Sequence, residues 1–77
     1  LFETLHATRE AGVRHLDRHL DRLGRSAQSL GFVFDEIELR EAIQLECGRL
    51  PPDAPQRLRL GLARSGRFDV IVQPLAA

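Results

Sequence analysis

Residues 57–72 read RLRLGLARSGRFDVIV, and this stretch decides the fold class. Apolar residues alternate with polar or small ones on either side of Ser65-Gly66, a dipeptide typical of a two-residue hairpin turn. Strands joined this closely must run antiparallel, because parallel neighbours need a crossover connection of about a dozen residues or more. The stretch therefore predicts a β-hairpin in the last third of the chain.

A two-residue turn would also fix the register of this hairpin. It would pair Leu60 with Ile71 and Leu62 with Asp69. On the opposite face, Arg59 would lie beside the apolar residues of the second strand, Phe68, Val70 and Val72. Both faces of the hairpin would then be substantially apolar. We therefore expect the Arg59 face to meet a second subunit or polypeptide absent from this chain.

A helix is predicted from about His15 to Leu30, because apolar residues recur there at spacings of three and four. Gly31 follows at the position where a left-handed C-terminal cap is needed. The predicted buried stripe consists of Leu16, Leu20, Leu23, Ala27 and Leu30.

A second helix is predicted to begin after Asp35, whose side chain can accept a hydrogen bond from the backbone of Glu38. Gly48 and the Pro51-Pro52 pair end it. Its predicted buried stripe consists of Leu39, Ala42, Ile43, Cys47 and Leu50.

The first residues alternate as a strand does, with Leu1, Glu3 and Leu5 on one face, and Thr8 to Val13 is expected to be a turn. The order is then strand, helix, helix, strand, strand. We expect the α+β class, with a small, mainly antiparallel sheet that carries two helices on one face. Residues 1–77 are expected to form a single subdomain.

The amino-acid composition restricts the classes of function that this protein can have. The formal net charge is zero, which argues against a nucleic-acid binder. No apolar run is long enough for a membrane span, and the single cysteine, Cys47, fits a reducing cytoplasm. All 11 basic residues are arginine, and there is neither lysine nor methionine. We expect the chain to begin inside a longer protein.

Several side chains are candidate site residues. His15 and His19 are four residues apart, but Leu16 stands where a metalloprotease helix has Glu, so we expect no metal site. Arg22 lies on the polar side of the first helix, where a solvated charged face is the simplest interpretation. Arg59 fits either an edge-strand charge or a partner for an anion, and these alternatives stay open.

Four segments together resemble the start of the fold-type IV pyridoxal-phosphate enzymes, the family of aminodeoxychorismate lyase and branched-chain aminotransferase. In chain order they are Phe2-Glu3-Thr4-Leu5, then His19-Leu-Asp-Arg22-Leu23-Gly-Arg-Ser26-Ala27, then Gly31-Phe32, and then Arg57-Leu-Arg59-Leu60. The similarity runs along nearly the whole chain, which also resembles the lyase segment that is often fused to aminodeoxychorismate synthase.

The resemblance implies roles for two arginines. Arg22 would contact the phosphate of pyridoxal 5'-phosphate, and Arg59 would lie near the substrate carboxylate. His6 stands where relatives commonly carry arginine, so a substrate role for it is not expected. The Schiff-base lysine of the family is missing, because the chain has no lysine. We therefore expect no catalytic residue in this chain, which should be inactive alone.

For the parent protein, the resemblance implies conversion of 4-amino-4-deoxychorismate to p-aminobenzoate and pyruvate, in folate biosynthesis. One alternative is an aminotransferase for branched-chain or D-amino acids, and another is a non-catalytic dimerisation module. The expected partners are a C-terminal subdomain that carries the lysine and a second subunit of a homodimer. Neither nucleic acid nor membrane is an expected partner.

Overall fold

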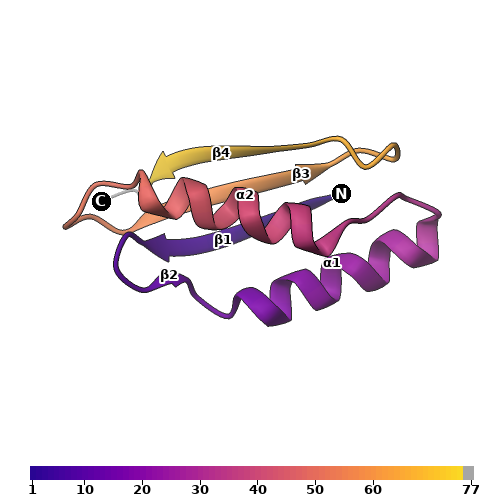
Figure 1. Cartoon of the computed structure of the whole chain (residues 1–77), viewed down its shortest axis with the longest axis horizontal. Helices are drawn as coiled ribbons and strands as arrows, with labels where there is room; N and C mark the ends of the chain where they lie inside the picture. The colour runs from indigo at the N-terminus through magenta and orange to yellow at the C-terminus, as the bar shows by residue number, and fades with distance from the viewer. Residues whose placement is uncertain (76–77) are drawn as a thin grey trace.

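The computed structural model describes residues 1–75 as an antiparallel sheet with two helices on one face (Figure 1). The elements, in chain order, are β1 (Phe2–Thr8), β2 (Gly12–Val13), α1 (Leu16–Leu30), α2 (Glu36–Gly48), β3 (Gln56–Leu62) and β4 (Phe68–Pro74). The strand order in the four-stranded sheet is β2-β1-β3-β4. The predicted class and the predicted order of the long elements are confirmed. The short β2 lies within the expected turn.

The end of α1 and the start of α2 follow their local sequence signals, whereas Gly48 lies inside α2 and Arg49 takes the capping position. Gly31 adopts a left-handed conformation after α1, with φ 75°, and the Phe32 N–H donates to the Ala27 carbonyl at 2.8 Å. At the start of α2, the Glu38 N–H donates to Asp35 Oδ1 at 3.1 Å. These hydrogen bonds satisfy backbone groups that a helix end otherwise leaves without a partner.

The core lies between the two helices and the sheet. The side chains at 0–1% exposure come from strands and helices alike: Leu5, Leu20, Ala27, Leu39, Ile43, Leu58 and Leu60. Leu30, which was predicted to be buried, is 54% exposed. The prediction is wrong there because the last turn of α1 extends past the N-terminal start of β1 (Figure 1). Ala42, also predicted to be buried, is only partly so.

The turn between β3 and β4 is one residue longer than predicted. The Ala63 N–H donates to the Arg67 carbonyl at 2.8 Å, and the Gly66 N–H donates to the Ala63 carbonyl at 3.0 Å. Gly66 has a φ of 93°, a left-handed value that favours glycine. A turn followed by a left-handed glycine is the usual three-residue hairpin loop, and Ser65-Gly66 fits its last two positions as well as a two-residue turn.

The extra loop residue shifts the register by one. Leu60 pairs with Val70 and Leu62 with Phe68, so the predicted pairs with Ile71 and Asp69 are wrong. Since side chains alternate along a strand, the shift moves every side chain of β4 to the other face. The apolar residues of β4 expected beside Arg59 lie instead on the helix face, namely Phe68, Val70 and Val72.

The uncovered face of the sheet is consequently mixed rather than apolar. Across the strands, Thr4 pairs with Arg59, and Arg59 pairs with Ile71. Phe2 and Ile71 are the exposed apolar side chains of this face, at 67% and 49% exposure. The expectation of two substantially apolar faces is therefore wrong.

Among the described residues, no helix is long and apolar enough to cross a membrane.

Candidate functional site

Glu3 is a carboxylate on the apolar, helix-covered face of the sheet. It pairs with Leu60 on β3 and alternates along β1 with the buried Leu5 and Ala7. Its side chain is only 10% exposed. A carboxylate in such a place needs hydrogen bonds and opposite charge to remain ionised.

Arg22, on α1, supplies most of that compensation. Arg22 Nη2 donates to Glu3 Oε1 at 2.7 Å, and Arg22 Nε donates to Glu3 Oε2 at 3.3 Å. This is the two-pronged geometry in which a guanidinium binds a carboxylate most strongly. The Arg22 side chain is itself 63% exposed, so the pair joins a nearly buried anion to a cation at the surface.

His19 lies one turn before Arg22 and binds the same carboxylate. Its Nδ1 is 2.8 Å from Glu3 Oε1. Since a carboxylate can only accept, Nδ1 carries the proton and donates. The 3.4 Å separation between Arg22 Nη2 and His19 Nδ1 is then a contact between two donors, not a hydrogen bond. We call Glu3, His19 and Arg22 the Glu3 cluster.

The electrostatics of the Glu3 cluster favour the charged forms. Burial raises the pKa of Glu3, but the hydrogen bonds and charges of Arg22 and His19 outweigh burial and bring the pKa below its ordinary value of 4.5. Glu3 in turn raises the pKa of Arg22. Glu3 is therefore ionised at neutral pH, despite its apolar surroundings.

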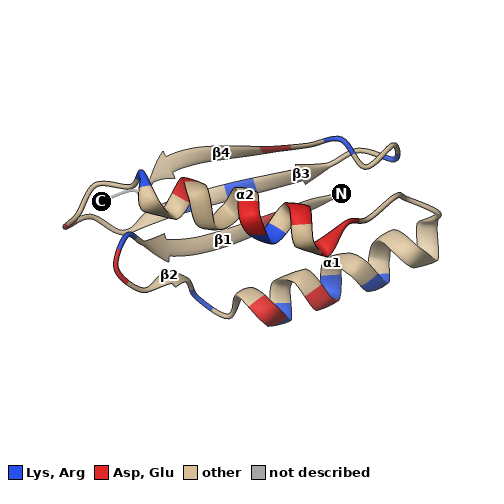
Figure 2. Cartoon of the chain, in the orientation of Figure 1, with Lys and Arg blue, Asp and Glu red and all other residues tan. Residues whose placement is uncertain are grey.

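Arg22 keeps donors that Glu3 does not use. A guanidinium has five N–H groups, and the bonds to Glu3 engage two of them. Beside it lies an open hollow of about 520 Å³, lined by Leu1, Arg22, Arg25, Ser26, Ser29 and Leu30. Arg25 pairs with Asp21 at 3.1 Å, and acidic and basic residues are mixed along α1 (Figure 2). An anion in this hollow could meet the free edge of Arg22 and two serine hydroxyls.

Arg59 lies on the uncovered face, away from the Glu3 cluster. Its Cζ is 4.4 Å from the centroid of the Phe2 ring, a cation–π contact. Within residues 1–75 it forms no ion pair. Arg22 and Arg59, the two predicted site residues, thus serve opposite faces of the sheet, and the structure does not bring them together.

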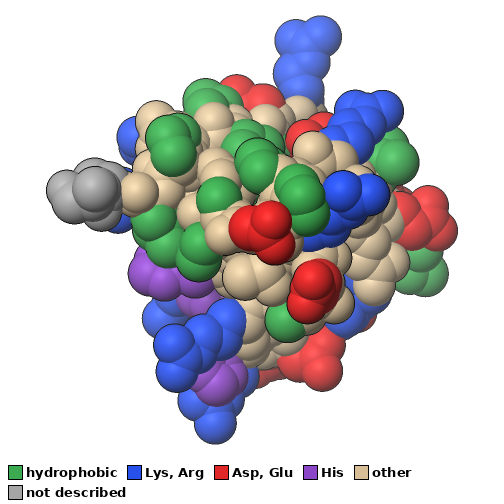
Figure 3. All heavy atoms as spheres, turned by 90° about the vertical axis from the view of Figure 1, so that its left-hand side faces the viewer, with side chains coloured by type: hydrophobic (Ala, Val, Ile, Leu, Met, Phe, Trp, Pro, Cys, Tyr) green, Lys and Arg blue, Asp and Glu red, His purple; other side chains and the backbone are tan. Residues whose placement is uncertain are grey.

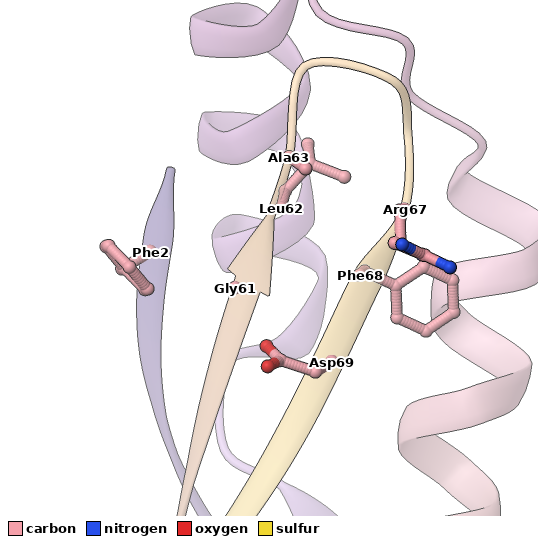
Figure 4. A pocket seen from close by; sticks show the side chains of 7 residues that line it. All are labelled: Phe2, Gly61, Leu62, Ala63, Arg67, Phe68 and Asp69. Carbon is pink, nitrogen blue, oxygen red and sulfur yellow. The ribbon is translucent and has the colours of Figure 1, made fainter.

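A hollow of about 480 Å³ lies at the loop end of β3 and β4, and neither Arg22 nor Arg59 lines it. Phe2 flanks Gly61 on one side, and Phe68 and Asp69 lie on the other (Figure 4). A Cβ at position 61 would come within 2.7 Å of Asp69 Oδ1 and 3.3 Å of the Phe2 ring. Gly61 therefore lets these two side chains approach each other.

The histidines gather at one end of the molecule, beside arginines (Figure 3). His6, His15 and His19 line a hollow of about 340 Å³ with Thr4 and Arg14. Within the described part of the chain, no group of three His, Cys, Asp or Glu side chains is placed to hold a metal ion.

Cys47 is buried in the core, where burial raises the pKa of its thiol and makes it a poor nucleophile.

Glu3 is the site residue that sequence reasoning missed. It had been placed correctly on one face with Leu1 and Leu5, and its signal was a charged residue on an apolar face. Such a residue indicates an opposite charge nearby. The partner could not be named, because Arg22 comes from another element.

No protein-family model matches the chain, and no curated protein matches it. Among solved structures, it is similar to a provisionally assigned amino-acid aminotransferase from Mesorhizobium loti, determined by crystallography at 2.30 Å resolution. The TM-score is 0.80 and the sequence identity is 35%. The similarity covers 99% of this chain and 36% of that protein, so the chain spans just over a third of its length. The fold is therefore that of part of an aminotransferase-like protein.

Proposed function

We propose that this chain is the N-terminal subdomain of a fold-type IV pyridoxal-phosphate enzyme. The observation that carries the proposal is the likeness to the aminotransferase over 99% of the chain at 35% identity. The short segments around Phe2, Arg22 and Arg59 that resemble the family agree with it. The activity belongs to a larger protein, since the chain has no lysine to attach the cofactor covalently.

The residues around Arg22 fit a phosphate group. The guanidinium is permanently charged, its orientation is fixed by Glu3, and its outer N–H groups remain available. Ser26, one turn further along α1, lines the same hollow and can donate from its hydroxyl. We assign Arg22 the role of holding the cofactor phosphate.

Arg59 is assigned to a substrate carboxylate. Its guanidinium is exposed, has no ion pair among residues 1–75, and rests on the Phe2 ring, which restricts its orientation. Because an unpaired guanidinium suits a planar carboxylate, Arg59 can orient a substrate that approaches the uncovered face. When bound, pyridoxal phosphate supplies an electron sink for the carbanion that forms at the substrate α-carbon.

For the reaction, we propose release of pyruvate from 4-amino-4-deoxychorismate to give p-aminobenzoate, in a cytoplasmic homodimer that serves folate biosynthesis. The second candidate is amino-group transfer between amino acids and keto acids. It is favoured by the name of the similar structure. The gene product that carries this chain separates the two. A lyase releases p-aminobenzoate without a keto-acid acceptor, whereas an aminotransferase requires the acceptor.

The cofactor assignment is tested by replacing Arg22 in that gene product and titrating it with pyridoxal phosphate. We expect Arg22→Gln to weaken binding by about tenfold or more, the effect of losing a charged hydrogen bond. Arg18→Gln is the matched control, because Arg18 is an exposed arginine on the same helix that does not line the hollow beside Arg22. It should change the dissociation constant less than about twofold.

Two results would refute the proposal. One is a gene product that shows no visible-edge absorbance on addition of pyridoxal phosphate. The other is a dissociation constant that Arg22→Gln leaves unchanged. If the gene product shows no such absorbance and sediments as a dimer, a non-catalytic dimerisation module becomes the better interpretation.

A further inference from the structure

Glu3 is a nearly buried carboxylate, with 10% of its side chain exposed, in a place that packing alone would fill with an apolar residue. Apart from Glu3 and the neutral Gln56, the helix-covered face of β1 and β3 is built of apolar side chains, and Glu3 pairs directly with Leu60. An apolar residue of similar size would fill this place without any desolvation of charge. Packing therefore does not explain why a carboxylate occupies this position.

That reason lies in what Glu3 does to Arg22. A free arginine on the surface of a helix samples many rotamers, and ordering it on binding weakens the affinity for a ligand. Here Nε and Nη2 are both held by one carboxylate, at 3.3 and 2.7 Å. The inner edge of the guanidinium is fixed, so the outer edge points away from Glu3 in a single orientation.

His19 fixes Glu3 in its turn. Its Nδ1–H donates to the oxygen that also accepts from Arg22 Nη2, and its side chain is 21% exposed. The carboxylate thus has a donor from each of two successive turns of α1, which restricts its rotation. Glu3 is anchored in β1, and the Glu3 cluster ties the orientation of Arg22 to the sheet rather than to α1 alone.

We infer that Glu3 is a positioning residue: it holds one edge of Arg22 so that the other edge is preorganised for a phosphoryl group. The inference rests on the proposed function, in which Arg22 binds the cofactor phosphate. It adds a residue that touches no ligand and acts through Arg22. The lowered pKa of Glu3 agrees with this role, because only the ionised form can accept both bonds.

The test uses two substitutions in the gene product that carries this chain. Glu3→Gln keeps the shape and removes the charge, and Glu3→Met replaces the carboxylate with an apolar side chain of similar size. Both should weaken pyridoxal phosphate binding by on the order of tenfold, the effect of ordering one long side chain on binding. Glu10→Gln, which removes an exposed carboxylate from the β1–β2 turn, should leave binding unchanged.

Thermal unfolding of the same variants separates positioning from a structural role. Glu3→Met should unfold at the same temperature as the wild type or higher, because it removes a nearly buried charge, while its affinity for pyridoxal phosphate falls. If stability and affinity fall together in both variants, Glu3 is merely structural and the inference is overturned.

A double-mutant cycle distinguishes this inference from the proposed function. In an Arg22→Gln background, Glu3→Gln should have no further effect on affinity, because the group it positions is gone. An equal loss in both backgrounds overturns the inference. If Arg22→Gln weakens binding and Glu3→Gln does not, the inference alone fails. If neither changes binding, the proposed phosphate contact fails and the inference fails with it.

Discussion

A charged residue introduced at two neighbouring positions of β4 should change the stability of the fold by very different amounts. Val70 faces the helices and pairs with Leu60, whereas Ile71 lies on the uncovered face, pairs with Arg59 and is 49% exposed. The two-residue turn predicted from the sequence would reverse these faces. Substituting aspartate at each position in turn tests the register directly, and the loss of strand propensity is the same in both variants.

The expected free energies follow from burial and charge. Val70→Asp should destabilise the fold by about 2–3 kcal/mol, because Val70 is partly buried against the core and a carboxylate there loses much of its hydration. Ile71→Asp should cost about 1 kcal/mol, since the side chain stays in water and lies opposite Arg59. A domain of 77 residues has a total stability of roughly 4–12 kcal/mol, so the first change removes much of it.

Urea denaturation followed by far-UV circular dichroism measures both values, because the chain has neither Trp nor Tyr for fluorescence. Unchanged m-values would show that the denatured states are comparable. If Ile71→Asp proves the more damaging of the two, the three-residue loop and the observed register are both wrong.

Other perturbations test the turn, the Glu3 cluster and a helix cap. Gly66→Ala should destabilise the fold by about 1–2 kcal/mol in urea, because φ is 93° and the new Cβ would lie 2.8 Å from Val33 Cγ1. Gly48→Ala, where nothing lies within 4 Å, should be neutral or stabilising. The pKa of Glu3 is lowered in the folded state, so its stabilisation is present above pH 4.5 and is lost as the pH falls through the folded pKa. The thermal midpoint should therefore drop less on acidification in Glu3→Gln than in the wild type. Asp35→Ala removes the cap of α2 and should cost about 1 kcal/mol by the same urea assay; no change would show that the hydrogen bond contributes nothing.

Local signals in the sequence were sufficient for the helices. A cap is made by residues a few positions apart, so Asp35 and Gly31 could be recognised without knowing the rest of the fold. The register of the hairpin could not be predicted in this way, because Ser65-Gly66 is compatible with both a two-residue and a three-residue loop. The observed loop also contacts a distant segment, the connection between α1 and α2, where the Val33 N–H donates to the Arg64 carbonyl at 3.0 Å. Such a contact depends on the whole fold and cannot be recognised in the local sequence.

The candidate site was only partly predictable for a similar reason. Resemblance pointed to Arg22 and Arg59, since both fall within recognisable short motifs. Neither motif gave the pairing of Arg22 with Glu3, because the two residues are 19 positions apart and meet only after α1 packs on β1. The placement of Arg59 on the uncovered face followed from the alternation of β3, whereas its neighbours depended on a register that the sequence left ambiguous.

The central pairing of the sheet joins distant parts of the chain and should govern how the protein folds. Leu1 and Leu62 exchange backbone hydrogen bonds across a separation of 61 residues, whereas β3 and β4 are joined by only the five residues 63–67. Closing so large a loop loses more chain entropy than forming the hairpin or either helix. We expect β1 to dock late, at the rate-limiting step. Leu5→Ala should then slow refolding in stopped-flow experiments, and an effect confined to the unfolding rate would place the docking of β1 after the barrier.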